Sequence, residues 1–183
     1  MDSILKEKLI RIRIGIKTLN IIHKVGEIIT DADKLLKLHE YDIYNNESIN
    51  PDNLCQLAEC FSKEDIDILE YFSYNKFSTK FCWLNAILII NVMKYPQKLK
   101  CLPWLFELLK DVNWPVYQEV IHTLMSFDKR DVVSVMEKCL QEAKSNEDEM
   151  WISGMYLAAQ ELIIGSWDFH NKNNYQIFYI RDI

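Results

Sequence analysis

The sequence predicts an all-α protein, organised either as an irregular α-solenoid or as a helical bundle. Glycine and proline, which interrupt helices and form tight turns, number only four each in 183 residues. Apolar residues recur at spacings of three and four, the period of a helix with one buried face. Polar side chains suited to helix caps stand at the start of several of these stripes.

The first predicted helix spans residues 3–24, where one apolar stripe ends before Gly26. Residues 10–16 also alternate with a period of two, which is typical of a strand. We favour the helix because the spacing of three and four continues on both sides of this segment. The stripe consists of Ile4, Leu5, Leu9, Ile12, Ile16, Leu19 and Ile22.

Residues 30–95 contain three helix starts and one long apolar stretch. Thr30, with a carboxylate three residues later, predicts a helix through about residue 44. Asn50-Pro51 predicts a second helix with proline in its first turn, and the capping box Ser62–Asp65 predicts a third. Residues 78–93 predict a buried helix that ends before Tyr95-Pro96, because a residue before proline avoids the helical conformation.

Residues 103–165 predict four helices joined by short turns. Pro103 opens a helix that ends near Asp111, and Trp114-Pro115 opens the next. Asp128 caps a third helix, and Asn146 caps a fourth that ends at Gly165. Two successive hairpins, residues 103–126 and 128–165, are typical of a stacked solenoid. For the last segment, residues 175–183, a helix and a short strand both stay open.

We interpret the chain as one helical domain, residues 1–183. Its first 95 residues form helices of unassigned type. Residues 96–165 form the helical hairpins, and residues 166–183 form a C-terminal tail.

One motif in the second half resembles a known family. The segment Asp111-Val112-Asn113-Trp114-Pro115-Val116, with Leu102–Leu105 before it and Glu147–Trp151 after it, resembles an uncharacterised bacterial domain family with a D-x-N-W-P-V turn. The resemblance covers roughly residues 97–160. It implies HEAT-like helical hairpins, and members of the family are seen among toxin–immunity proteins. It implies no catalytic activity. We expect Trp104, Trp114 and Trp151 to be core anchors, and Asn113 to satisfy a backbone group of the turn.

The charge of the chain is unevenly distributed. The net charge is −6, yet residues 1–24 carry six cationic side chains against two acidic ones, so the remaining 159 residues carry −10. A chain this acidic repels phosphate backbones, and we expect no nucleic-acid partner. The longest apolar stretch, residues 81–93, is too short for a membrane span. No signal peptide is visible, and the five cysteines match no disulfide framework, so we expect a cytoplasmic protein.

No catalytic, cofactor-binding or metal-binding pattern is recognisable. The four histidines form no H-x-x-x-H pair, and no cysteine pair has the spacing of a zinc site. Four glycines are too few for a phosphate-binding loop, and no nucleophile elbow occurs. We therefore expect no cofactor, no metal and no enzymatic activity.

Acidic clusters with neighbouring tyrosines are the remaining candidate site. Carboxylates in helix caps and first turns are commonly only solvated faces. The alternative is a docking surface for a basic protein, since complementary charge steers association. The candidate residues are Glu59, Glu64, Asp65, Asp67, Glu70, Tyr71, Tyr74, Glu142, Glu147 and Asp148.

Two functions fit these observations. The first is an immunity protein that binds a cognate bacterial toxin, a basic nuclease-type toxin in its simplest form, and occludes its active site. The second is a non-catalytic scaffold or adaptor with the same fold. The sequence leaves the oligomeric state open.

Overall fold

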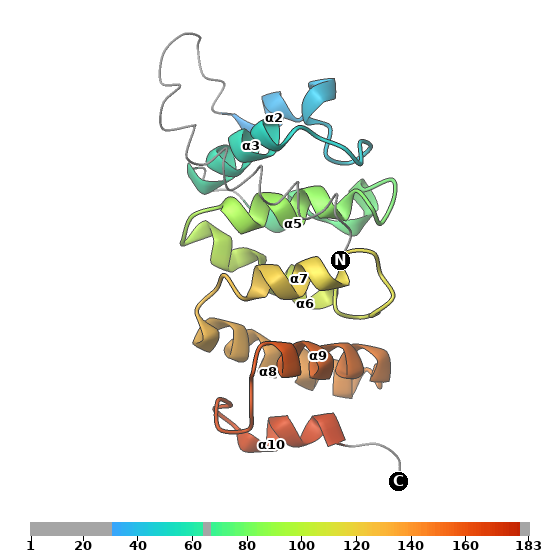
Figure 1. Cartoon of the computed structure of the whole chain (residues 1–183), viewed down its shortest axis with the longest axis vertical. Coiled ribbons are helices and arrows are strands. Elements are labelled where there is room, and N and C mark those ends of the chain that lie inside the picture. The colour runs from blue at the N-terminus through green and yellow to red at the C-terminus, as the bar shows by residue number, and fades with distance from the viewer. Residues whose placement is uncertain (1–30, 64–66, 180–183) are drawn as a thin grey trace. The chain divides into compact units, whose positions relative to one another are not determined.

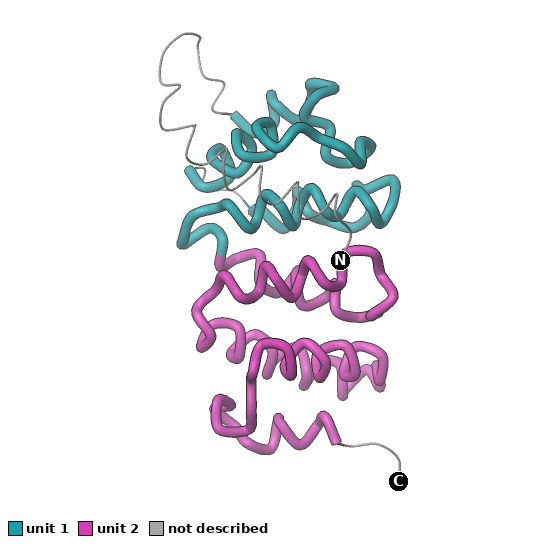
Figure 2. Tube along the Cα trace, in the orientation of Figure 1, with its two compact units in different colours: residues 1–98 teal, residues 99–183 magenta. Residues whose placement is uncertain are grey.

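The computed structural model describes residues 31–63 and 67–179, and within these ranges the protein is all-helical and has no strand (Figure 1). The all-α prediction is therefore confirmed. The chain divides into two compact units, residues 1–98 and 99–183 (Figure 2). The choice between a solenoid and a bundle stays a prediction, and the helix predicted for residues 3–24 lies outside the described residues.

Unit 1 is built on two helices, α3 (Pro51–Lys63) and α5 (Trp83–Val92), which pack against each other. The Asn50 side chain accepts a hydrogen bond from the N–H of Asp52 at 3.0 Å, and Pro51 occupies the first turn, as predicted. The predicted buried helix is α5, although it begins at Trp83 rather than near residue 78. Its buried Asn85 donates to the carbonyls of Ile43 and Asn46, which fixes the loop before α3 against α5.

The helix predicted for residues 30–44 is much shorter in the structure. Its cap is Asp31, whose carboxylate accepts from two backbone N–H groups, and α2 (Ala32–Leu35) ends after four residues. A 3-10 turn, η1 (His39–Tyr41), follows. The Asp42 carboxylate then accepts from the N–H groups of Tyr44 and Asn45, each at 3.2 Å. These local bonds replace helical hydrogen bonds, and the sequence pattern did not reveal them.

The capping box predicted at Ser62 is wrong. Ser62 lies inside α3, where its hydroxyl donates to the carbonyl of Ala58 at 2.6 Å and accepts from the N–H of Lys94 at 3.0 Å. The cap of the next helix, α4 (Ile68–Tyr71), is Asp67, which accepts from the N–H of Leu69. A 3-10 turn, η2 (Tyr74–Lys76), leads from α4 toward α5.

Unit 2 contains five described helices after the 3-10 turn η3 (Gln97–Cys101), in which the boundary between the units falls. Pro103 lies in the first turn of the first helix and Asp128 caps the third, both as predicted. The last segment is helical through residue 179, so the helix alternative is confirmed for residues 175–179. The elements are α6 (Leu102–Glu107), α7 (Tyr117–Leu124), α8 (Lys129–Ser145), α9 (Glu149–Glu161), α10 (Lys172–Tyr175) and η4 (Gln176–Tyr179).

The core of unit 2 forms where α8 packs against both α6 and α9. The Trp151 indole of α9 donates to the carbonyl of Phe106 at 2.7 Å, and the Tyr117 hydroxyl donates to the carbonyl of Gly154 at 2.8 Å. A Cβ at Gly154 would lie 1.9 Å from the carbonyl oxygen of Leu109. The close approach of α9 to the end of α6 therefore requires glycine at this position.

The D-x-N-W-P-V turn joins α6 to α7. The helix start predicted at Trp114-Pro115 is wrong, because these residues belong to the turn and α7 begins at Tyr117 with Val116 as its N-cap. Asp111 organises it, because its carboxylate accepts from both the N–H and the side-chain amide of Asn113. The role predicted for Asn113 is thus performed by Asp111. Trp104 and Trp151 are buried as predicted, whereas Trp114 is only half-buried.

Both ends of α9 differ from the prediction. Asn146 belongs to the end of α8, and Asp148 caps α9 by accepting from the N–H of Trp151 at 2.9 Å. Between them Glu147 has a left-handed φ of 55°, and α9 itself ends before Ile163, with a φ of 54°, rather than at Gly165. Each helix ends in a 6→1 and a 5→2 backbone bond, in which glycine is the usual left-handed residue. Neither position carries the glycine that would have marked the end.

Candidate protein-binding surfaces

The acidic face of unit 1 consists of Glu59 on α3 and Asp67 and Glu70 on α4. Asp67 and Glu70 are exposed, and neither forms an ion pair with a described cation. Glu59 is half-buried and lies 3.9 Å from Lys63. Two further predicted members, Glu64 and Asp65, lie outside the described residues.

The two tyrosines of this face have different environments. The Tyr71 hydroxyl donates to the Asp33 carboxylate at 2.8 Å, and its ring packs edge-on against Phe61 of α3. The ammonium of Lys76 lies 5.3 Å from the same ring centroid. Tyr71 therefore holds α4 beside α2 and α3, and adds Asp33 to the acidic face.

Tyr74 presents little polar surface to a partner. Its ring packs edge-on against Trp83, and its hydroxyl oxygen is buried. Tyr71 is consequently the better tyrosine candidate for contact with another protein.

The acidic turn of unit 2 consists of Glu142, Glu147 and Asp148, where α8 ends and α9 begins. Glu142 and Glu147 are exposed, and neither pairs with a cation in the described ranges. The Asp148 carboxylate already accepts a hydrogen bond as the cap of α9. It therefore contributes to a partner mainly through its negative charge. A negative charge at this cap is stabilised by the helix dipole.

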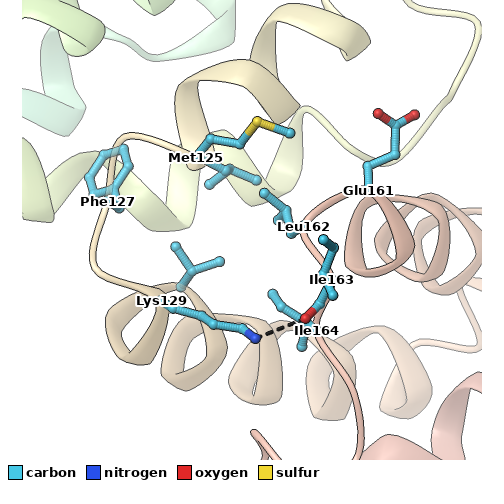
Figure 3. A pocket seen from close by; sticks show the side chains of 9 residues that line it. Met125, Phe127, Lys129, Glu161, Leu162, Ile163 and Ile164 are labelled. Atoms are coloured by element: carbon cyan, nitrogen blue, oxygen red, sulfur yellow. Dashed lines mark hydrogen bonds between the residues drawn. The ribbon is translucent and has the colours of Figure 1, made fainter.

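A groove in unit 2 was not anticipated from the sequence. It lies between the C-terminal turns of α7 and α9 and the first turn of α8, with a volume of ≈ 320 Å³ (Figure 3). We call it the α7–α9 groove. Most of its lining is aliphatic or aromatic, and its rim includes two exposed apolar side chains, Met125 at 53% and Ile163 at 76% exposure.

Of the charged side chains at the α7–α9 groove, Lys129 has an acidic partner, whereas Glu161 pairs with no described cation. Lys129 donates to the carbonyl of Ile163 at 2.8 Å and pairs with Asp168 at 2.9 Å (Figure 3 shows the first of these bonds). Burial raises the pKa of Asp168, but hydrogen bonds from the Gly165 N–H and from Lys129 outweigh it, so the pKa is lowered overall. Glu161 is exposed at the rim and forms no ion pair with a described cation.

The groove was missed because its walls come from two segments far apart in the sequence, residues 124–132 and 161–164. One local signal was present: the apolar run Leu162-Ile163-Ile164 continues past the end of α9 without a glycine. Such a run is unusual where a helix ends in a left-handed residue.

Two histidines of unit 2 contact buried carboxylates. The Nδ1 of His122 lies 3.7 Å from Glu119, and burial raises the pKa of Glu119 although His122 opposes the shift. The Nδ1 of His170 lies 3.3 Å from Glu137, which also accepts from the N–H of Asn171 at 2.9 Å. The second pair fastens the loop before α10 onto α8.

Metal ligands, reactive thiols and membrane-spanning helices were also sought among the described residues. There, no three histidine, cysteine or carboxylate side chains come together as metal ligands. The five cysteines are buried and form no disulfide, and burial raises the thiol pKa of Cys55 to about 11 and of Cys139 to about 12. Buried neutral thiols of this kind are poor nucleophiles. None of the described helices is both long and apolar enough to cross a membrane.

No protein-family model, curated protein or solved structure matches this chain.

Proposed function

We propose that this chain is an immunity protein that binds a cognate bacterial toxin and neutralises it by covering its active site. The observation that carries the proposal is a set of exposed carboxylates that form no ion pair with a cation of the described ranges: Asp67 and Glu70 on unit 1, and Glu142 and Glu147 on unit 2. Exposed carboxylates without a cationic partner on the same surface favour a cationic protein. Toxins that cleave nucleic acids are cationic because they bind phosphate backbones.

The sequence motif around Asn113-Trp114-Pro115 supports the same proposal through its resemblance to proteins of toxin–immunity loci. Its role here is to join two helices of unit 2, with Asp111 organising the turn. A rigid helical unit of this kind presents a preformed surface, which lowers the entropic cost of binding. Inhibition by such a surface is occlusion and requires no catalytic group.

The decisive experiment is co-expression with the product of the neighbouring gene. The proposal predicts a one-to-one complex on size-exclusion chromatography, and restored growth of cells that express a basic, growth-inhibiting partner. Absence of a partner, or several weak partners, would instead favour the scaffold or adaptor function.

Charge reversal tests the acidic surfaces separately. Glu70→Lys and Glu142→Lys should each lower the association rate several-fold at low salt, with smaller effects at 0.5 M salt, because exposed charges act mainly on the association rate and are screened. Glu40→Lys is the matched control, because it also reverses an exposed carboxylate. The backbone carbonyl of Glu40 accepts a hydrogen bond from the Asn53 side chain, at the other end of α3 from Glu59. Asp67 is left unchanged because it also caps α4.

A further inference from the structure

The α7–α9 groove has the size and lining of an anchor pocket for one large side chain. Its ≈ 320 Å³ lies at the lower end of the range for ligand pockets, and it is lined mainly by apolar side chains. Met125 and Ile163 stand at its rim with more than half of their surface exposed. Single exposed apolar residues are ordinary, but two beside an apolar hollow indicate a contact surface.

The backbone at the groove is strained at Ile163. Ile163 has a φ of 54°, a conformation that β-branched residues rarely adopt and that glycine adopts without cost. Strained residues are concentrated at binding sites, where the surrounding structure holds them in place. Here the carbonyl of Ile163 is held by Lys129, and the following N–H donates to the carbonyl of Ala159 at 2.8 Å.

The charges around the groove favour a cationic group on whatever binds there. Met125 is the C-cap of α7 and Leu162 is the C-cap of α9, so the negative ends of two helix dipoles lie at the groove, against the positive end of one, α8. Glu161 adds an exposed carboxylate, while the charge of Lys129 is matched by Asp168. The net field at the rim is therefore negative.

We infer that the α7–α9 groove receives a leucine-sized or aromatic side chain of a partner protein, and that a lysine or arginine next to this anchor in the partner pairs with Glu161. The inference rests on the proposed function, because it adds an apolar anchor to the acidic surfaces. Interfaces gain most of their affinity from such anchors, whereas charges at the rim mainly set the association rate. Met125 suits the role because its unbranched side chain adapts to the shape of an incoming group.

The test uses the full chain with methionine methyl groups labelled with ¹³C. The chain has six methionines, and a Met125→Leu variant assigns the Met125 signal. Met150 is an internal control, because it is also exposed, at 60%, but lies near the start of α9 rather than at its end. The probe is the dipeptide N-acetyl-leucyl-lysine amide, titrated while both methyl signals are recorded.

The expected result is a saturable shift of the Met125 signal with a dissociation constant on the order of 1 mM, without a comparable shift at Met150. Replacing lysine by glutamate, or leucine by alanine, in the probe should weaken binding about fivefold. Glu161→Gln should remove the preference for lysine over glutamate. Equal responses at Met125 and Met150, or no preference for lysine, would overturn the inference. So would a Met125 shift on raising the protein concentration alone, since a second copy would then occupy the groove.

A second measurement separates this inference from the proposed function. In a complex with a cognate partner, Ile163→Asp should weaken affinity about 100-fold, as expected for a central contact. Aspartate tolerates the left-handed conformation, so this variant keeps its fold. A complex that forms with unchanged affinity would contradict the groove while leaving the immunity proposal intact. Dipeptide binding without any toxin partner would contradict the immunity proposal while leaving the groove intact.

Discussion

Replacing Gly154 by alanine should destabilise the protein, although the same change in an unhindered helix is stabilising. Alanine in a helix interior is favoured over glycine by about 0.5–1 kcal/mol. Here the new Cβ would lie 1.9 Å from the carbonyl oxygen of Leu109, and ordinary contact begins at 3.4 Å. One of the two backbones must therefore move by about 1.5 Å.

The magnitude follows from this movement. Overpacking of a core costs about 1–3 kcal/mol. The displaced helix would also weaken the buried hydrogen bond from Tyr117 to the carbonyl of Gly154, worth about 1 kcal/mol. After the gain in helix propensity is subtracted, we expect the free energy of unfolding to fall by about 2 kcal/mol, within a range of about 1–3.5 kcal/mol. The midpoint of thermal unfolding should fall by roughly 5–10 °C.

Urea unfolding followed by tryptophan fluorescence measures the effect, because Trp104 and Trp151 are buried in the core of unit 2. Ser153→Ala is the matched control: it places alanine at the preceding, exposed position of α9 and should change stability by less than about 0.5 kcal/mol. If Gly154→Ala proves as stable as Ser153→Ala, the described packing of α9 against the end of α6 is incorrect.

Three further predictions concern strain, pH and thiol reactivity. Ile163→Gly should raise the free energy of unfolding by about 1 kcal/mol in urea titrations, because it removes a left-handed β-branched residue that is 76% exposed; a loss of stability would contradict the assigned strain. The raised pKa of Glu119 means that the folded protein retains a proton that the unfolded chain releases, so stability should fall as pH rises above about 4.5. Glu119→Gln should reduce that fall and be stabilising at pH 8, by an amount on the order of 1 kcal/mol; an unchanged pH profile would refute the assignment. Titration with Ellman's reagent at pH 8 should detect less than one thiol in the folded protein and five in 6 M guanidinium chloride, and fast reaction of several thiols would contradict the burial of Cys55, Cys60, Cys82, Cys101 and Cys139.

The sequence was most informative where a helix start depends on residues adjacent in the chain. Asn50-Pro51 and Asp128 were correctly predicted as starts, because the cap and the first turn lie within three residues of one another. Ser62 looked equally suitable, yet the helix continued through it because its hydroxyl bonds to the carbonyl of Ala58. A serine in the last turn of a helix can either cap the next helix or bond back to its own helix. The tertiary hydrogen bond from the N–H of Lys94 favours the bond within the helix.

Helix ends were less predictable because the C-terminal ends of α8 and α9 both lack the usual glycine. Glu147 and Ile163 occupy left-handed positions where glycine is expected, so the pattern pointed to Asn146 and Gly165 instead. What holds Ile163 is tertiary, because Lys129 donates to its carbonyl from another helix. No reading of local spacing reveals a bond of this kind.

The candidate surfaces likewise include features that the sequence reveals and features that only the fold reveals. The acidic residues were visible in the sequence because charge is a property of composition, and Asp67, Glu70, Glu142 and Glu147 are exposed in the structure. The bond of Tyr71 to Asp33 and the α7–α9 groove were not visible, because each joins segments that are about 30 or more residues apart. Apolar surface becomes a binding site only when folding brings its parts together.

The central claim is that the chain inhibits by covering a partner and performs no chemistry on it. The most direct test titrates a fixed amount of the toxic partner with this protein, measures the remaining toxic activity, and then records the mass of the partner after denaturing separation. The account predicts that activity falls linearly to zero at one equivalent and that the partner is recovered with unchanged mass and activity. Inactivation of many partner molecules by each copy of this chain, or a changed partner mass, would contradict it and indicate an enzyme.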